Sequence, residues 1–138
     1  MTESRPVDQW KGEFGAAYIK RNTASAAAVR QRTILWGRYL WSLLPAMPRS
    51  ILEVGCSVGI NVRALNNVTD AELHAVEPNA HARETVISDG VLPSERLHAA
   101  TADALPFEDG AFELSFTSGV LIHVPPSELP AAVDELHR

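Results

Sequence analysis

The sequence is short of the features that mark several classes of protein. Its single cysteine cannot build a disulfide framework or a cysteine-based zinc site. No run reaches the roughly 18 uncharged apolar residues of a membrane span, because Arg38, Pro45 and Pro48 interrupt the longest apolar stretch, residues 34–48. The start of the chain lacks the apolar core of a secretory signal. We therefore expect a cytoplasmic protein with no membrane partner.

An excess of positive charge is also missing. The net charge is −5, whereas proteins that bind nucleic acid normally carry a basic stripe, so we expect no nucleic-acid partner. The charge is uneven, since residues 1–50 carry +5 and residues 51–138 carry −10. A solvated basic helix lying on an acidic domain explains this asymmetry, and attraction of an anionic substrate is the alternative.

The features that are present fit one compact domain. A chain of 138 residues, 46% hydrophobic and 21% charged, has the size and composition of an ordinary globular protein. Apolar side chains at helical spacing predict two helices near the N-terminus, over residues 7–18 and 29–44, with Pro45 ending the second. We expect residues 1–48 to form a helical cap on a domain that spans residues 49–138.

From residue 50, short apolar runs alternate with helical stretches, which is typical of βαβ units and predicts a parallel sheet. The last helix is expected to begin at an N-cap, Ser127, and to bury an apolar face that includes Val133. The predicted strands cover residues 50–54, 73–76, 96–100 and 112–117, and the predicted helices cover residues 60–68, residues 78–90 and the stretch after Ser127.

A turn that contains glycines follows the first predicted strand. Residues 51–59 read ILEVGCSVG, and Gly55 and Gly59 let the backbone approach a ligand, while the next helix presents free N–H groups to a carboxylate or phosphate. Ser57 and Ile60 stand where the dinucleotide fingerprint G-x-G-x-x-G has its second and third glycines. No Gly-Lys-Ser/Thr follows, which excludes a Walker-type phosphate loop.

An acidic residue, Glu77, ends the second predicted strand, 24 positions after Glu53. In this place a carboxylate can accept hydrogen bonds from both hydroxyls of a ribose, in either a nicotinamide or an adenosyl ligand. The alternative is a surface carboxylate that is stabilised by the dipole of the following helix. The spacing favours the ribose contact.

A third block, TADALPFEDGAFELSFTSGVLIHV at residues 101–124, completes a pattern. Together with the glycine turn and the acidic residues after the second and third strands, it resembles class I S-adenosylmethionine-dependent methyltransferases. The segment WKGEFGAAYIKRN, residues 10–22, and the GVLIHV segment resemble more narrowly the methyltransferases associated with pseudaminic acid biosynthesis. The resemblance implies a Rossmann-like α/β fold with S-adenosylmethionine as cofactor. Because that fold usually continues through three more strands, it also implies a truncated C-terminal half.

The resemblance implies roles for individual residues as well. Glu53 would lie near the methionine part of the cofactor, Glu77 would hold the ribose hydroxyls, and Asp103 would accept from the adenine amino group. The other implied cofactor-binding residues are Gly55, Cys56 and Gly59 near the methionine part, Pro78, Asn79 and Ala104 near the adenine, Ser118, Gly119 and Val120 beneath the sulfonium, and Tyr18, Arg21 and Asn22 in a lid.

Two side chains invite a catalytic role. Cys56 could act as a nucleophile, but methyl transfer needs none from the protein, so packing explains a small residue there better. His123 follows the fourth predicted strand, and an imidazole with a pKa of about 6.5 suits a general base, while capping the next helix is the alternative. His74, His81 and His98 lack metal-ligand spacing, so we expect no metal site.

The expected function is methyl transfer from S-adenosylmethionine to an oxygen or nitrogen nucleophile of a small molecule, and the narrower resemblance implies a sugar-related or nonulosonic-acid-related acceptor. The first alternative is a truncated, non-catalytic protein that binds the cofactor or a partner. A nicotinamide oxidoreductase ranks third, because the glycine spacing disfavours it. The fourth predicted strand has a free edge, so we expect a homodimer through that edge, coverage by the N-terminal helices, or aggregation.

Overall fold

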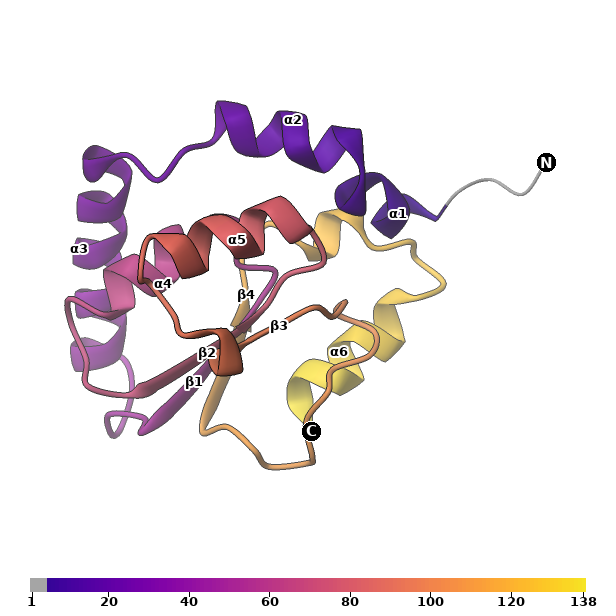
Figure 1. Ribbon diagram of the computed structural model, residues 1–138. Helices are drawn as coiled ribbons and strands as arrows, with labels where there is room; N and C mark the ends of the chain where they lie inside the picture. Colours follow the sequence, from indigo (N-terminus) through magenta and orange to yellow (C-terminus); the bar gives the residue numbers. More distant parts are fainter. Residues whose placement is uncertain (1–4) are drawn as a thin grey trace.

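A four-stranded sheet lies at the centre of the computed structural model, which describes residues 5–138 (Figure 1). All of its strand pairings are parallel, which confirms the expected α/β class. Residues 1–4 of the expected cap lie outside the described part of the chain. The strands are β1 (Ser50–Val54), β2 (Glu72–Val76), β3 (Leu97–His98) and β4 (Leu114–Thr117), and their order in the sheet is β3-β2-β1-β4.

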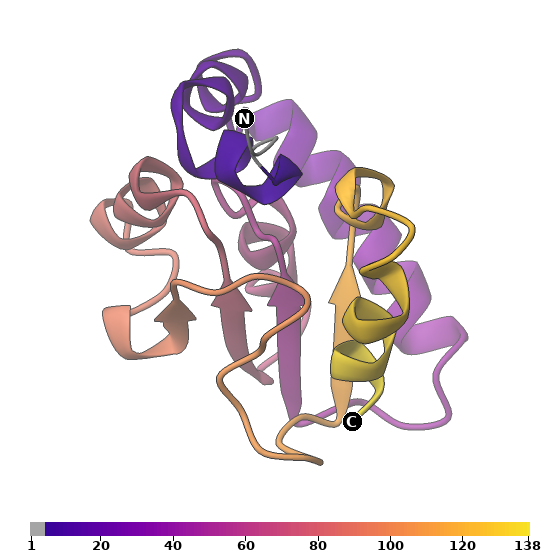
Figure 2. The same ribbon diagram turned by 90° about the vertical axis from the view of Figure 1, so that its right-hand side faces the viewer.

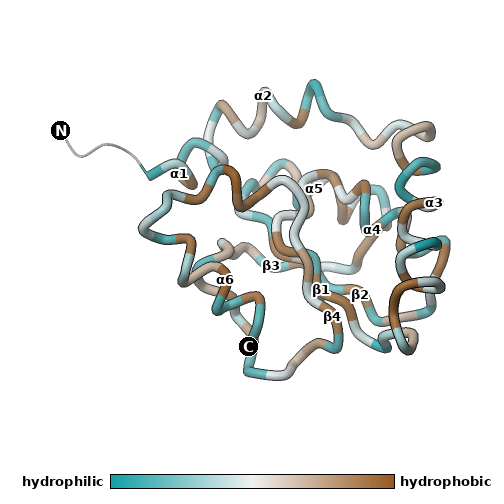
Figure 3. Tube along the Cα trace, turned by 180° about the vertical axis from the view of Figure 1, so that it is seen from behind, coloured by the Kyte–Doolittle hydropathy of each residue, from teal (hydrophilic) through white to brown (hydrophobic). Residues whose placement is uncertain are grey.

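Helices cover both faces of the sheet, so successive side chains of β1 are buried on opposite sides. Ile51 and Leu52 are each 1% exposed and belong to two different apolar clusters. This explains why β1 has apolar residues on both of its faces, and Figure 3 shows brown stretches of the tube where the strands run through the middle of the molecule. The cluster of Ile51 includes residues of α3 (Ala26–Ser42), α4 (Ile60–Leu65) and α5 (Ala80–Ser88), and that of Leu52 includes α6 (Leu129–His137).

Within residues 5–49, three helices precede the sheet, where the sequence predicted two. The first expected helix is divided into α1 (Pro6–Lys11) and α2 (Glu13–Arg21) at Gly12, whose ψ of −151° is extended. Glycine costs about 1 kcal/mol relative to alanine inside a helix, which makes this position the weak point. Figure 2 shows α1 and α2 above the carboxyl ends of the strands. None of the helices within residues 5–138 is long and apolar enough to cross a membrane.

Two other expectations are corrected. The third strand is shorter than residues 96–100, because the chain pairs with β2 only at Leu97 and His98 and then turns across the top of the sheet. Helix α6 has Glu128 and not Ser127 as its N-cap, with no side-chain cap hydrogen bond. Its Ala132 is fully buried, so the neighbouring Val133 is rotated by about 100° and is 47% exposed.

Candidate functional site

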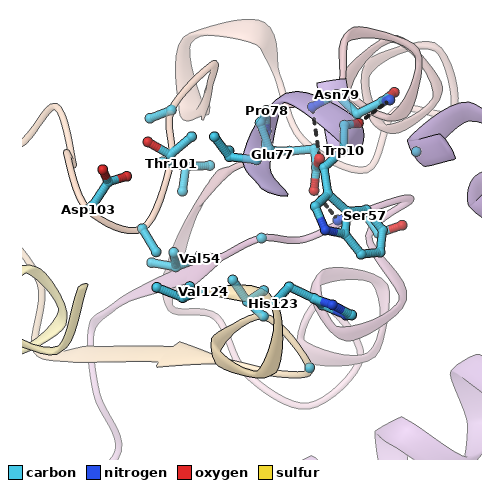
Figure 4. Close-up of a pocket in the computed structure, with 18 of the residues that line it drawn as sticks. Trp10, Val54, Ser57, Glu77, Pro78, Asn79, Thr101, Asp103, His123 and Val124 are labelled. Carbon is cyan, nitrogen blue, oxygen red and sulfur yellow. Dashed lines mark hydrogen bonds between the residues drawn. The ribbon is translucent and has the colours of Figure 1, made fainter. Parts of the chain in front are cut away.

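A pocket opens where β1 and β2 end, beneath α1 and α2 (Figure 4). Its walls come from Val54 and Val76 at the ends of these strands and from the loops that follow all four strands. Strand β1 lies between β2 and β4, so the connections that leave β1 and β4 run to opposite faces of the sheet. A crevice at such a switch point is where open α/β sheets bind ligands.

The turn after β1 gives the pocket its shape. Gly55 has a φ of +82°, and a Cβ at this position would overlap the side chain of Val120. Ser57 has a φ of 50°, a left-handed conformation that costs a non-glycine residue roughly 1–2 kcal/mol. The backbone amides of Gly55, Cys56 and Ser57 all donate to the end of β2 or to the residue after it. The absence of a side chain at Gly55 therefore makes room for Val120, and these three amides are already bonded within the protein.

Glu77 lines the pocket directly after β2 and is 7% exposed. Its Oε2 accepts a hydrogen bond from the Ser57 amide at 2.8 Å, and its Oε1 accepts one from the Asn79 amide at 2.9 Å. Burial raises the pKa of Glu77, and the two backbone hydrogen bonds oppose that shift. Because a carboxylate oxygen has two lone pairs, Glu77 keeps the capacity to accept hydrogen bonds from a ligand.

A second carboxylate, Asp103, lies at the far end of the pocket from Ser57 (Figure 4). Its Oδ2 accepts a hydrogen bond from Nη2 of Arg5 at 3.0 Å. Hydrogen bonds from the Thr101 side chain and from Arg5 hold the pKa of Asp103 below its usual range. The apolar residues that line the same pocket include Val54, Val76, Pro78, Ala100 and Ala102.

Aromatic rings gather where α1 and α2 meet the segment after β4. The ring of Trp10 lies 4.7 Å from that of His123, measured between centroids, and contacts Phe14 and Tyr18 edge-on. The side-chain amide of Asn79 donates to the carbonyl oxygen of Trp10 at 2.8 Å. His123 follows β4 in a short 3-10 turn and is exposed beside the pocket. This end of the pocket therefore presents an imidazole next to an aromatic wall.

Most of the residues that the sequence predicted as ligand contacts line this pocket. Among the expected lid residues, Tyr18 lines it, whereas Arg21 and Asn22 are exposed at the end of α2 and do not. Ala104 is exposed beside the pocket without lining it. The predicted residues that line the pocket are Tyr18, Gly55, Glu77, Pro78, Asn79, Asp103, Ser118, Gly119, Val120 and His123.

Three further predicted residues, Glu53, Cys56 and Gly59, are buried and do not line the pocket. Oε1 of Glu53 accepts a hydrogen bond from Asn61 at 2.7 Å, and Asn61 accepts one from the Trp36 indole at 3.2 Å. Burial raises the pKa of Glu53 to about 8. It also raises the pKa of the Cys56 thiol, which is consistent with a packing role because the reactive form of cysteine is the thiolate.

Sequence reasoning missed the polar contacts that hold α1 over the pocket. Arg5 and Glu128 both line it and are joined by a hydrogen bond of 2.8 Å, although 123 positions separate them. No local pattern predicts a pair so distant in sequence. The helical spacing of Trp10, Phe14 and Tyr18 was an available signal, and it predicted a helix without identifying the contact of Trp10 with His123.

The chemistry of the pocket suits an organic ligand. Within residues 5–138, no group of three His, Cys, Asp or Glu side chains lies close enough to hold a metal ion. Two separated carboxylates, Glu77 and Asp103, can accept hydrogen bonds from hydroxyl or amino groups, and the apolar residues around them can cover a flat ring. The imidazole of His123, beside Trp10, can accept a proton.

Residues 51–138 match a protein-family model described as a methyltransferase domain. No curated protein matches the chain. Solved structures do, and a candidate S-adenosyl-L-methionine-dependent methyltransferase from Methanococcus maripaludis has a TM-score of 0.71 at 16% sequence identity. That match covers 100% of this chain and 62% of the other one.

Two further structures are described as sugar-modifying enzymes. An amino pentose methyltransferase of calicheamicin biosynthesis from Micromonospora echinaspora, with S-adenosylmethionine bound, is 19% identical with a TM-score of 0.58, over 89% of this chain and 49% of that one. A sugar N-methyltransferase from Streptoalloteichus is 21% identical with a TM-score of 0.53, over 91% and 48%. The chain thus spans between about half and 62% of the length of these proteins. The likeness shows the fold, which is the expected Rossmann-like fold of class I methyltransferases.

Proposed function

The chain belongs to the family of methyltransferase domains whose model matches residues 51–138, and on that premise we propose that it transfers a methyl group from S-adenosylmethionine to an oxygen or nitrogen of a small molecule. The observation that carries the proposal is the position of Glu77 and Asp103 in one pocket with apolar walls. Ribose hydroxyls and an adenine amino group are the hydrogen-bond donors that such carboxylates accept, and adenine is a flat ring that apolar side chains can cover.

In this proposal the residues that follow each strand bind different parts of the cofactor. Glu77 holds the ribose hydroxyls, Asp103 binds the adenine amino group, and the backbone amide of Ala104 binds a ring nitrogen. Glu53, Cys56 and Gly59, which are buried, support the turn around the methionine part. The other proposed contacts are Gly55 with the methionine part, Pro78 and Asn79 beside the adenine, Ser118, Gly119 and Val120 beneath the sulfonium, and Tyr18, Arg21 and Asn22 as a lid.

S-adenosylmethionine carries a methyl group that is already activated on a sulfonium, so the protein need not supply a nucleophile. The work of the chain is to hold the acceptor atom in line with the methyl carbon and the sulfur. S-adenosylmethionine would supply the methyl group, and His123 would take the proton of the acceptor at a ring nitrogen. We expect His123→Ala to lower kcat by about 10²–10⁴-fold and to weaken the binding of S-adenosylhomocysteine far less, since the His123 ring also packs on Trp10.

The proposed acceptor is a small sugar or a nonulosonic acid. Two structurally similar proteins are described as an amino pentose methyltransferase and a sugar N-methyltransferase, which supports this acceptor class. The narrower resemblance of residues 10–22 points the same way. Sugars of both kinds carry hydroxyl or amino groups, and these are the oxygen and nitrogen nucleophiles that the proposal requires.

The proposal assigns residues 1–48 as a helical cap on the cofactor-binding domain of residues 49–138, because α1 and α2 contribute walls to the pocket. It places the protein in the cytoplasm. It also includes a homodimer formed through β4, since that strand pairs only with β1 among the strands of residues 5–138. An unpaired strand edge is a template for pairing with another chain.

The second candidate is a non-catalytic protein that binds the cofactor or a partner. The observation that favours it is coverage, because the chain spans only 62% of the methanogen protein and about half of the two sugar enzymes. A cofactor pocket can persist in such a chain while the acceptor wall is incomplete. The second candidate predicts no turnover, so an assay of methyl transfer to hydroxyl-bearing and amino-bearing sugars separates the two.

Calorimetric titration of the purified chain with S-adenosylhomocysteine and, separately, with NAD tests the cofactor assignment. The proposal predicts saturable binding of S-adenosylhomocysteine and no binding of NAD. Binding of NAD alone would support an oxidoreductase, and the absence of binding to either compound would contradict the proposal.

A further inference from the structure

One end of α1 is tied to two carboxylates of the pocket by a single side chain. Nη2 of Arg5 donates to Oδ2 of Asp103 at 3.0 Å and to Oε2 of Glu128 at 2.8 Å. Asp103 follows β3, whereas Glu128 is the N-cap of α6, so one guanidinium joins three segments that are distant in sequence. Without a cation between them, the two carboxylates would face each other as like charges.

The other end of α1 is tied to the opposite wall. The carbonyl oxygen of Trp10 accepts from the side-chain amide of Asn79 at 2.8 Å, and the Trp10 ring packs on His123. Figure 4 shows Trp10 between Asn79 and His123. A Cβ at Gly15 of α2 would overlap the Trp10 carbonyl oxygen, so α2 fits against α1 at this point only with a glycine.

The two attachments differ in kind. The Asn79 bond is partly buried, but the Arg5 side chain is 52% exposed, and exposed ion pairs are weak and sensitive to salt. The end of α1 at Arg5 is therefore the more weakly held end. Hydrogen bonds from Thr101 and Arg5 lower the pKa of Asp103, so its charge persists in mildly acidic solution.

We infer that Arg5 is a positioning residue of the cofactor site: by joining Asp103 to Glu128 it orients the proposed adenine acceptor and fastens α1 over the bound cofactor. The inference rests on the proposed function. In this arrangement a cofactor enters and leaves when the bonds of Arg5 break, and its dissociation slows when they form. Arg5 acts through Asp103 and through the closure of α1, so its removal changes the lifetime of the complex more than the stability of the fold.

The test measures the dissociation rate of S-adenosylhomocysteine from the full chain by stopped-flow displacement. We expect Arg5→Ala to raise this rate about fivefold or more, and Arg5→Lys to restore part of the slow rate because an ammonium can still pair with one carboxylate. The matched control is Lys20→Ala, which removes an exposed cation of α2 that does not line the pocket. The control is expected to keep the wild-type rate.

The salt dependence of the dissociation rate distinguishes this role of Arg5 from a purely structural one. Raising the NaCl concentration from about 50 to 500 mM should speed dissociation from the wild type and from Lys20→Ala, and should have little effect on Arg5→Ala, which has no ion pair left to screen. Equal dissociation rates and equal salt responses in all variants would overturn the role of Arg5 while leaving cofactor binding intact. A wild-type chain that binds no S-adenosylhomocysteine would contradict the proposed function itself, and the inference with it.

Discussion

The pocket side of the molecule and its β4 flank are built differently. On the pocket side, side chains bond to backbone, as Glu77 does to two amides and Asn79 does to α1. We define the β4 flank as the outer edge of β4 together with Leu35, Tyr39 and Leu43, which recur every four residues along and just after α3. These three side chains are 54%, 39% and 71% exposed, and β4 itself is only half-buried.

The pocket and the β4 flank therefore differ in whether they need a second chain. Satisfied hydrogen bonds fix the pocket loops without contacts from another chain, so we expect the isolated chain to bind a cofactor. A free strand edge beside exposed apolar side chains is typical of an interaction surface. The β4 flank continues inward through Tyr39, whose ring lies 5.6 Å from that of Trp36, and Trp36 packs on Phe116 of β4 at 4.5 Å. We therefore expect the β4 flank to associate with a second copy of the chain and the pocket to bind the cofactor.

The largest expected effect breaks the pocket side. Glu77→Ala removes the proposed ribose acceptor and the carboxylate that ties the Ser57 and Asn79 amides together. Hydrogen bonds to charged groups contribute about 1.5–3 kcal/mol each, so the dissociation constant of S-adenosylhomocysteine should rise at least 100-fold by calorimetry. Glu84→Ala, at an exposed carboxylate of α5, is the control and should bind normally. An unchanged affinity in Glu77→Ala would remove this residue from the site.

The next effect lies between the two regions, where Glu53 bonds to Asn61 and Asn61 to Trp36. The folded-state pKa of Glu53 is raised to about 8 from 4.5, so the protein holds an extra proton when folded. The stabilisation is fully present below pH 4.5 and is lost as the pH rises through 8. Each pKa unit corresponds to about 1.4 kcal/mol, so the change amounts to a few kcal/mol at most.

Urea unfolding at several pH values in this window measures the effect. Glu53→Gln keeps an oxygen for Asn61 and removes the titration, so its free energy of unfolding should lose this fall with rising pH. Glu84→Gln should retain the wild-type dependence. If Glu53→Gln retains it as well, then Glu53 titrates normally in the folded chain and the account of its burial is wrong.

A smaller effect is expected on self-association, and it tests the β4 flank independently of the pocket. Leu35→Lys combined with Leu43→Lys places charge on the β4 flank and should weaken self-association at least tenfold in sedimentation equilibrium, which corresponds to about 1.4 kcal/mol. Affinity for S-adenosylhomocysteine should stay unchanged. Trp41→Lys is the matched control, since Trp41 is 73% exposed on the same helix but outside the flank. A wild-type chain that stays monomeric at all concentrations would contradict the proposed dimer.

The smallest effect concerns the strained residue of the pocket turn. Ser57→Gly relieves the positive φ but frees the unfolded chain, so the free energy of unfolding should change by less than about 1 kcal/mol. Ser57→Val, with a β-branched side chain at the same φ, should be destabilised by about 1–2 kcal/mol in the same urea experiment. Equal stability of the two variants would show that the turn relaxes to another conformation.

Patterns of neighbouring residues predicted those parts of the fold that depend on interactions between neighbours in sequence. The apolar run of β1 and the position of Glu77 after β2 follow from periodicity and spacing, and the structure has β1 at its predicted bounds. Gly12 is a weak point that the sequence itself contains, whereas the exposure of Val133 depends on how α6 packs on the rest of the chain.

The candidate site shows the same division. The resemblance to methyltransferases implied a role for Asp103, and this residue lines the pocket. The contact of Arg5 with Glu128 joins segments that no sequence window contains together. The burial of Glu53 behind Asn61 likewise depends on where α4 packs.

Amide hydrogen exchange of the full chain, with and without saturating S-adenosylhomocysteine, tests the central claim most directly. The account predicts added protection in the pocket segments, residues 55–59, 77–79 and 101–104, and in α1, with no ligand-dependent change along residues 114–117 of β4. Protection confined to β4 and α3, or no protection anywhere at saturating ligand, would contradict the claim that the carboxyl ends of β1 and β2 form an adenosyl cofactor site.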